Sequence, residues 1–200
     1  MTDPNDISVD RFIALLRNSQ DVIDSDLRER FDRSLPFQDA VFDRWERARK
    51  LGFGKDASIY QSAHVFGRVT VGAGTWIGPY VILEGAGGGI SIGSTCSISS
   101  GVHIYTHDTV GWALTGGRLK GRAGAVSIGN CTYIGSQSVI SAGITIGSCC
   151  VVAANSFVSR DLDDNTIAAG SPARRIGRVE IRNDEPVLVY DGGGETMLRS

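Results

Sequence analysis

The hydrophobic pattern of residues 128–159 repeats every six positions. The repeated positions are β-branched without exception: Ile128, Ile134, Ile140, Ile146, Val152 and Val158. Glycine or another small residue follows each of them. An amphipathic helix needs a period near 3.6 and an alternating strand a period near 2, so neither element explains the pattern. A period of six is typical of a β-solenoid, in which each unit forms one short strand and a turn and the stacked coils share one core.

The same period continues upstream, with two interruptions. The rhythm slips by three residues at positions 87–89, and a second break covers residues 107–125. Insertions in a solenoid project from the coil as loops and often carry function. The upstream repeat positions are Ile59, Val65, Val71, Ile77, Leu83, Ile92, Ile98 and Ile104.

The segment before the repeats has a helical pattern. A helix is expected from Ser8, which can cap it, with Val9, Phe12, Ile13 and Leu16 on one face. A second helix is expected near residues 24–36 and a third over 37–51, while residues 1–7 are expected to be frayed. Together they predict a helical region over residues 1–56 that covers the open edge of the first coil.

The solenoid is expected to cover residues 57–178, with a projecting loop at 107–125, and a tail covers 179–200. The fold class is therefore mainly β, a parallel β-helix with an N-terminal helical cap. Val187 to Tyr190 form a candidate strand within the tail, and a run of three glycines at 192–194 is expected to be flexible.

Composition excludes several classes of function. The formal net charge of -2 gives no case for a nucleic-acid surface. No apolar run approaches the roughly 18 to 20 residues that span a bilayer. The polar first ten residues contain no signal peptide, so a cytoplasmic location is expected. The 26 glycines are attributed to turns that require small residues and positive φ.

None of the four cysteines has the C-x-x-C spacing of a metal or redox motif. They are expected to be free thiols that pack as small residues, and no metal is expected. Cys149 and Cys150 are adjacent, and the alternation of a strand predicts that they face opposite sides.

The repeats, the histidine-bearing segment 103–108 and the closing sequence NTIAAGSPAR at residues 165–174 together resemble the hexapeptide-repeat acyltransferase superfamily. The resemblance is to its maltose, galactoside, nodulation-type and surface-polysaccharide O-acetyltransferases. It implies a left-handed parallel β-helix, an exception to the usual right-handed crossover. It also implies acetyl-CoA as the donor and a homotrimer with active sites between subunits.

Acetyl transfer to an alcohol needs a base, because an alcohol is a poor nucleophile until its proton is removed. A neutral imidazole, with an unperturbed pKa of about 6.5, suits this role. Of the three histidines, His107 lies where the coil breaks into the loop and matches the catalytic histidine of the resembled family. His64 and His103 each precede an inward-pointing residue, so both are expected on the outer surface.

Two carboxylates are candidates for orienting His107 or for binding a sugar hydroxyl. Asp108 is its neighbour, and Glu84 lies close to the position where the resembled sugar acetyltransferases have an acidic acceptor-binding residue. Trp112, at the apolar tip of the loop, is a candidate acceptor wall or a contact to the next subunit. The family's acceptor-side asparagine has no clear counterpart near Gly78 and Pro79, which weakens the case for the family's sugar specificity.

The donor site is inferred from the family motif. Backbone N–H groups of small residues commonly stabilise the oxyanion in such sites, and Gly135 and Ser136 are the candidates here. The arginines would bind the phosphates. The positions that match donor contacts in the family are Ser136, Ala154, Ser159, Arg160 and Arg174.

Several alternatives remain open. Within the enzyme class, the acceptor could instead be an amino sugar acetylated on nitrogen, a serine or a xenobiotic. A zinc lyase of the γ-carbonic anhydrase type shares the solenoid and uses three histidines, but its close pair is spaced by five, whereas His103 and His107 are spaced by four. A trimer without catalytic activity that binds a ligand or partner is the third alternative.

Overall fold

The computed structural model describes residues 8–198, so the expectation for residues 1–7 lies outside it. The chain divides into two compact units, one up to Asp43 and one from Arg44 onward. The first unit contains α1 (Val9–Phe31) and α2 (Phe37–Val41). Ser8 caps α1 as predicted, because its hydroxyl accepts a hydrogen bond from the backbone N–H of Arg11 at 3.3 Å.

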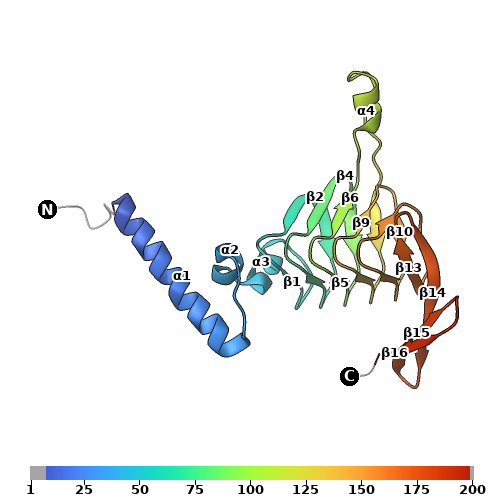
Figure 1. The fold of residues 1–200 in the computed structure, drawn as a ribbon. Helices are drawn as coiled ribbons and strands as arrows, with labels where there is room; N and C mark the ends of the chain where they lie inside the picture. The colour runs from blue at the N-terminus through green and yellow to red at the C-terminus, as the bar shows by residue number, and fades with distance from the viewer. Residues whose placement is uncertain (1–7, 199–200) are drawn as a thin grey trace. The chain divides into compact units, whose positions relative to one another are not determined.

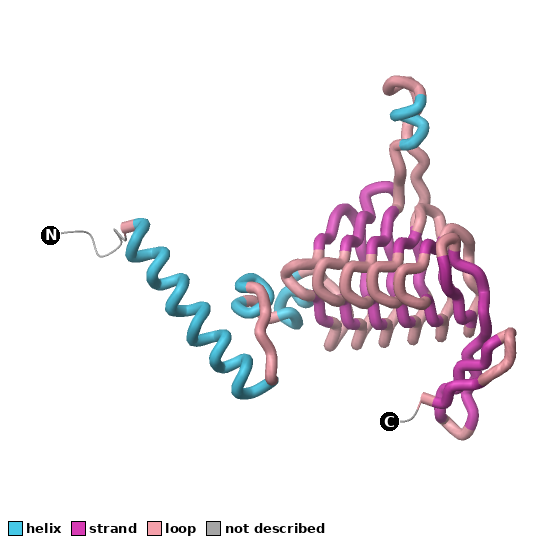
Figure 2. The backbone as a smooth tube through the Cα atoms, viewed as in Figure 1, coloured by secondary structure: helices cyan, strands magenta, loops and turns pink. Residues whose placement is uncertain are grey.

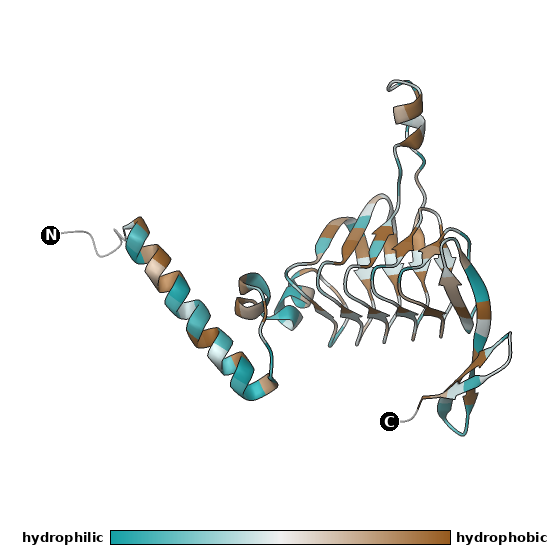
Figure 3. Ribbon diagram, in the orientation of Figure 1, coloured by the Kyte–Doolittle hydropathy of each residue, from teal (hydrophilic) through white to brown (hydrophobic). Residues whose placement is uncertain are grey.

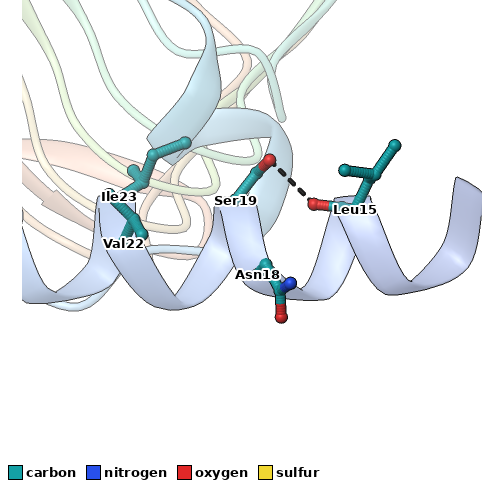
Figure 4. A pocket seen from close by; sticks show the side chains of 5 residues that line it. All are labelled: Leu15, Asn18, Ser19, Val22 and Ile23. Atoms are coloured by element: carbon teal, nitrogen blue, oxygen red, sulfur yellow. Dashed lines mark hydrogen bonds between the residues drawn. The ribbon is translucent and has the colours of Figure 1, made fainter. Parts of the chain in front are cut away.

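α1 is one continuous helix where the sequence predicts two. The expected boundary is spanned by ion pairs one turn apart, between Asp24 and Arg28 at 2.8 Å and between Asp26 and Arg30 at 3.3 Å. No residue of α1 is buried. Its surface has alternating apolar and polar patches (Figure 3), and a shallow depression on it is lined by Leu15, Asn18, Ser19, Val22 and Ile23 (Figure 4).

The single helix predicted over residues 37–51 is instead two helices. The chain is extended at Phe42, which separates α2 from α3 (Arg44–Lys50). α3 belongs to the second unit and covers the first coil of the solenoid. The Arg47 guanidinium donates to the backbone carbonyls of Tyr60 and Ala63, the latter at 2.8 Å. These contacts satisfy carbonyls at an edge that has no further coil beside it.

The second unit is a parallel β-helix whose short strands stack into three flat faces (Figures 1 and 2). The first face contains β1 (Ser58–Ile59), β3 (Trp76–Ile77), β5 (Ser97–Ile98), β8 (Tyr133–Ile134), β11 (Val151–Val152) and β13 (Thr166–Gly170). The second contains the beginnings of β2 (His64–Val71) and β4 (Ile82–Ile92), then β6 (His103–Tyr105), β9 (Val139–Ile140) and β12 (Phe157–Val158). The third contains the ends of β2 and β4, then β7 (Val126–Ile128) and β10 (Thr145–Ile146).

The predicted repeat positions form the core of this β-helix. Each lies directly over its equivalent in the next coil; for example, Ile104 pairs with Leu83 on one side and Ile140 on the other. All of them are buried except Val65 in the first coil, which is partly buried against the same core. The predicted period and its inward side are therefore confirmed.

Glycine has only part of the role expected. Three positions before most repeat positions the backbone has positive φ; glycine occupies some of these corners, as at Gly74 and Gly101, but most are held by other residues, as at Cys131, Gln137 and Cys149. The glycines that follow the repeat positions allow close stacking instead. A Cβ atom on Gly135 would lie 2.5 Å from the backbone nitrogen of Ala154 in the next coil.

We number the corners by the faces that they join. The first corner joins the first and second faces, the second corner joins the second and third, and the third corner joins the third and first. Both interruptions of the repeat lie at the second corner, where the loop of residues 107–125 carries α4 (Val110–Leu114) and projects from the coils (Figure 1).

The C-terminal segment continues the first face as an antiparallel sheet of β14 (Ala173–Arg182), β15 (Glu185–Tyr190) and β16 (Glu195–Met197). β15 contains the strand predicted from Val187 to Tyr190, whereas the flanking strands were not predicted. Cys149 and Cys150 were expected on opposite sides of a strand, but Cys149 lies in a corner turn with φ of 56° and Cys150 directly precedes β11; of the two, Cys150 is buried.

Candidate active site

His107 lies at the base of the projecting loop, where the outgoing and returning arms meet. It pairs with Ala123 of the returning arm through a β-bridge, and the next pair is held by the N–H of Asp108 on the carbonyl of Arg122 at 2.9 Å. The Nδ1 atom of His107 is buried and has no hydrogen-bond partner among the described residues. A buried polar atom without a partner is costly and is often a functional group.

The glycine interruption of the preceding coil lies against this histidine. A Cβ atom on Gly87 would be 2.3 Å from the carbonyl oxygen of Thr106 and 2.7 Å from the Cβ of His107. Only a glycine therefore fits at position 87. The two interruptions, which are separate in the sequence, form one structure at the second corner.

Thr106 joins these two segments and was missed by the sequence analysis. It is fully buried, its hydroxyl donates to the carbonyl of Glu84 at 2.6 Å, and it accepts from the N–H of Gly87 at 2.8 Å. Thr106 lies two residues after the core position Ile104 and directly before the loop. A hydroxyl residue at that position was the sequence signal that could have identified it. Thr106 positions His107 through the backbone and is not itself a reacting group.

The two candidate carboxylates both lie near the loop base, and both have local partners. The Glu84 carboxylate accepts from the N–H of Ala86 at 3.0 Å. Asp108 accepts from the N–H of Val110 at 3.1 Å and lies 3.5 Å from the Arg122 guanidinium. Asp108 therefore holds the two arms of the loop together. Glu84 keeps its other carboxylate oxygen for a further partner, because a carboxylate accepts at two oxygens.

Trp112 lies on α4 at the loop tip and is 57% exposed, and Leu114 beside it is 81% exposed. Within the chain, the Trp112 carbonyl accepts from the N–H of Gly117. Exposure of this much apolar surface on a projecting loop is typical of a segment that contacts another molecule.

The candidate donor residues fall into two groups on different corners. Ser159 and Arg160 follow β12 and lie at the second corner, the corner of His107. Ser136 and Ala154 follow β8 and β11 at the first corner, and Arg174 pairs with Ala169 at the same end of the first face. The strands of the second face separate the two groups, so one chain does not bring them into a single site.

The oxyanion candidates differ in availability. The N–H of Gly135 donates to the carbonyl of Val152 at 2.8 Å, so it is occupied by coil stacking. Ser136 is the next residue, on the exposed side of the same turn, and its carbonyl accepts from the N–H of Asn155 at 2.9 Å. The N–H of Ser136 is therefore the better candidate for donating a hydrogen bond to the oxyanion, and Gly135 serves close packing.

The other two histidines have aromatic partners on the outer side of the second face. His64 stacks on Phe66, with ring centroids 6.1 Å apart, and the Nδ1 of His103 lies 3.2 Å from the Tyr105 hydroxyl. No group of three His, Cys, Asp or Glu side chains within residues 8–198 is placed to hold a metal ion. Nor is any helix in that range both long and apolar enough to cross a membrane.

Comparison with known proteins finds similar acetyltransferases, although no protein-family model matches the chain. It is 43% identical over 58 residues to the galactoside O-acetyltransferase of Escherichia coli K12, which covers 29% of each chain. It is 29% identical over 178 residues to a chloramphenicol acetyltransferase of Agrobacterium fabrum, covering 78% of this chain and 80% of the relative. The hexapeptide-repeat acetyltransferase VCA0836 of Vibrio cholerae, solved with acetyl-CoA, has a TM-score of 0.59 and 25% identity over 86% of this chain and 90% of that one.

Over most of its length the chain resembles acetyltransferases of the hexapeptide-repeat superfamily. The six-residue period predicts a β-solenoid and the family resemblance implies a left-handed parallel β-helix, which is the fold of these structural neighbours, so the fold prediction is confirmed. The length of the match differs between relatives. The chain spans less than a third of the galactoside O-acetyltransferase but 80% of the chloramphenicol acetyltransferase. The similarity therefore establishes the fold of the chain, and the relatives that it matches are acetyltransferases.

Proposed function

We propose that the protein is an acetyl-CoA-dependent acetyltransferase that acetylates a hydroxyl group of a sugar, a nucleotide sugar or a surface polysaccharide. His107 is the general base. The observation that carries the proposal is the placement of a single histidine, with a buried and unpartnered ring nitrogen, at the meeting point of both interruptions of the repeat. A regular solenoid needs neither interruption for its stability.

The proposed chemistry uses three groups of the protein. Neutral His107 removes the proton of the acceptor hydroxyl as the oxygen attacks the thioester carbonyl. The N–H of Ser136 stabilises the resulting oxyanion. The tetrahedral intermediate then expels the thiolate of coenzyme A, which takes up a proton. Glu84 binds a second acceptor hydroxyl through its remaining carboxylate oxygen, which keeps the attacking hydroxyl in place.

The donor is bound by its phosphates and its extended arm. Arg160 and Arg174 are both exposed and supply the cations for the phosphates. Acetyl-CoA is the expected co-substrate because a structural neighbour was solved with it. The small residues Ala154 and Ser159 leave room for the pantetheine arm to approach the coil backbone.

We further propose that the site is completed between copies of a homotrimer. The two groups of donor residues lie on corners at opposite edges of the second face, and a neighbouring copy placed against that face would bring the corners together. Exposed aromatic side chains support the second face as the interface, with Phe66 47% and Phe157 38% exposed. The third face instead presents hydroxyl side chains in register, Thr70, Ser91, Ser127 and Thr145, which suit contact with water.

The activity is tested by incubating the purified protein with acetyl-CoA and a panel of sugars, nucleotide sugars, amino sugars, serine and aminoglycoside- or phenicol-type drugs. Release of free coenzyme A and the mass of the product report transfer. Product on a sugar hydroxyl that is lost in His107→Ala supports the proposal. Product only on an amine would indicate an N-acetyltransferase. No product with any acceptor would contradict the proposed enzymatic activity.

The shared site has a separate test by complementation. His107→Ala removes a group at the second corner and Arg174→Glu removes one at the first corner. When the two variants are co-expressed, a random trimer restores roughly a quarter of the sites if each site takes its corners from two different chains. A site that lies within one chain regains no activity in the mixture, because every chain then carries one defect.

A further inference from the structure

Two cysteines occupy equivalent positions in consecutive coils at the third corner. Cys131 precedes β8 and Cys149 precedes β11, and these strands pair in register, Tyr133 with Val151. Both cysteines adopt the same left-handed backbone conformation, with φ of 57° and 56°. Cys131 is exposed and Cys149 is half-buried, and neither forms a disulfide in the structure.

The backbone spacing of these positions already suits a disulfide. The N–H of Cys149 donates to the carbonyl of Asn130, the neighbour of Cys131, at 2.8 Å. Adjacent parallel strands lie about 4.8 Å apart, which falls within the range of roughly 4.4 to 6.8 Å between the Cα atoms of a disulfide. The spacing of stacked coils is therefore compatible with the Cα separation of a disulfide at these positions.

The two thiols also lie close enough to influence each other. Partial burial raises the pKa of the Cys149 thiol, and the nearby Cys131 sulfur raises it further, together with the charge of Asp164. Cys131 is the more exposed of the two sulfurs, so it is the one that a peroxide in solvent reaches first, with Cys149 beside it. This division of roles matches an attacking and a resolving thiol.

The remaining cysteines are not available for this chemistry. Cys96 and Cys150 are buried, and their thiols lie 3.1 Å from the backbone carbonyls of Gly129 and Asp163. Burial raises the pKa of both thiols, which keeps them protonated. They pack inside the third corner, as the sequence analysis expected of all four.

We propose that Cys131 and Cys149 are a redox-sensitive dithiol, which a peroxide oxidises reversibly to an intramolecular disulfide between adjacent coils. The Cys131 thiolate attacks one peroxide oxygen, which breaks the O–O bond, forms a sulfenic acid and releases the other oxygen as water after protonation. The Cys149 sulfur then attacks the Cys131 sulfur and loses its proton, and the sulfenic hydroxyl leaves as water. Two thiols and one hydrogen peroxide thus give one disulfide and two waters, and a dithiol reductant reverses the change.

This inference is independent of the proposed function. The third corner carries none of the candidate catalytic or donor residues, which lie at the first and second corners. The bond would close a loop of one complete coil, and such a cross-link stabilises a fold by restricting the unfolded chain. Oxidation is therefore expected to raise the Tm of the protein.

The test uses the full-length protein, reduced, freed of reductant and treated with an equimolar amount of hydrogen peroxide. Remaining thiols are then alkylated in denaturant. We expect two fewer alkyl groups on the intact protein and a linked pair of peptides after chymotryptic cleavage, because cutting after Tyr133 separates Cys131 from Cys149. The link should disappear, and the Tm should return to its reduced value, after treatment with dithiothreitol.

Matched variants assign the bond. Cys131→Ser and Cys149→Ser, both at surface turns, should each abolish the link and the rise in Tm, whereas Cys150→Ala should retain both. A link between Cys149 and Cys150, a dimer joined through Cys131 of two copies, or oxidation of Cys131 to sulfinic acid without any link would each overturn the proposal.

Discussion

Replacing Gly87 with alanine should displace His107 without touching the histidine itself. The added Cβ would lie 2.3 Å from the Thr106 carbonyl oxygen and 2.7 Å from the His107 Cβ, whereas ordinary contact begins at 3.4 Å. The backbone at the loop base must therefore move by about 1 Å. A misplacement of about 1 Å in a catalytic group can cost on the order of 100-fold in rate.

The cost to the fold should be smaller than the cost to catalysis. Overpacking of this kind typically destabilises a protein by about 1–3 kcal/mol. For a chain of this size that lowers the Tm by about 2–4 °C per kcal/mol. We expect Gly87→Ala to fold, to bind acetyl-CoA with nearly parental affinity and to lose about 100-fold in kcat.

The assay measures kcat for acetyl transfer, the Kd of acetyl-CoA by calorimetry and the Tm by circular dichroism. Gly192→Ala is the matched control, since a Cβ there has no atom within 4 Å. A folded Gly87→Ala protein with parental kcat would refute the reasoning, because the contact between the two interruptions would then have no bearing on the chemistry.

Ile140→Ala, at a fully buried repeat position, should destabilise the protein by about 2–5 kcal/mol in denaturant titrations, whereas Ile181→Ala, at a position 63% exposed, should change stability by less than about 0.5 kcal/mol. Arg174→Glu should weaken acetyl-CoA binding by at least tenfold, roughly the 1.4 kcal/mol of one charge-assisted hydrogen bond, while Arg49→Glu on α3 should leave the Kd unchanged. Light scattering should report a trimer at micromolar concentration, and a stable monomer would contradict the shared site.

The solenoid was predictable because its core depends on one repeated requirement. Every buried repeat position must hold a β-branched or similar apolar side chain at the same place in each coil, and that requirement is visible as a period of six. The positions of the loop and of His107 followed from the breaks in the period. The contact of Gly87 with His107 was not predictable in detail, since it depends on which coil positions stack at the second corner.

The helices were predicted less well because their boundaries depend on side-chain pairing. The acidic cluster at residues 24–26 indicated a new helix start, but Asp24 and Asp26 pair with arginines one turn later and continue α1. Cys149 was assigned to a strand because small residues at corners and in strands look alike in sequence. β14 and β16 have no six-residue period, and their pairing with β15 is set by tertiary contacts.

The central claim is that His107 removes the acceptor proton, and a comparison of His107→Ala with His103→Ala tests it most directly. His103 is the control because its Nδ1 already lies 3.2 Å from the Tyr105 hydroxyl. With the best acceptor, His107→Ala should lose about 100- to 10,000-fold in kcat while the Kd of acetyl-CoA stays within a few-fold of the parental value. His103→Ala should keep most of its activity. A His107→Ala protein with near-parental kcat would show that another group is the base and would contradict the account at its centre.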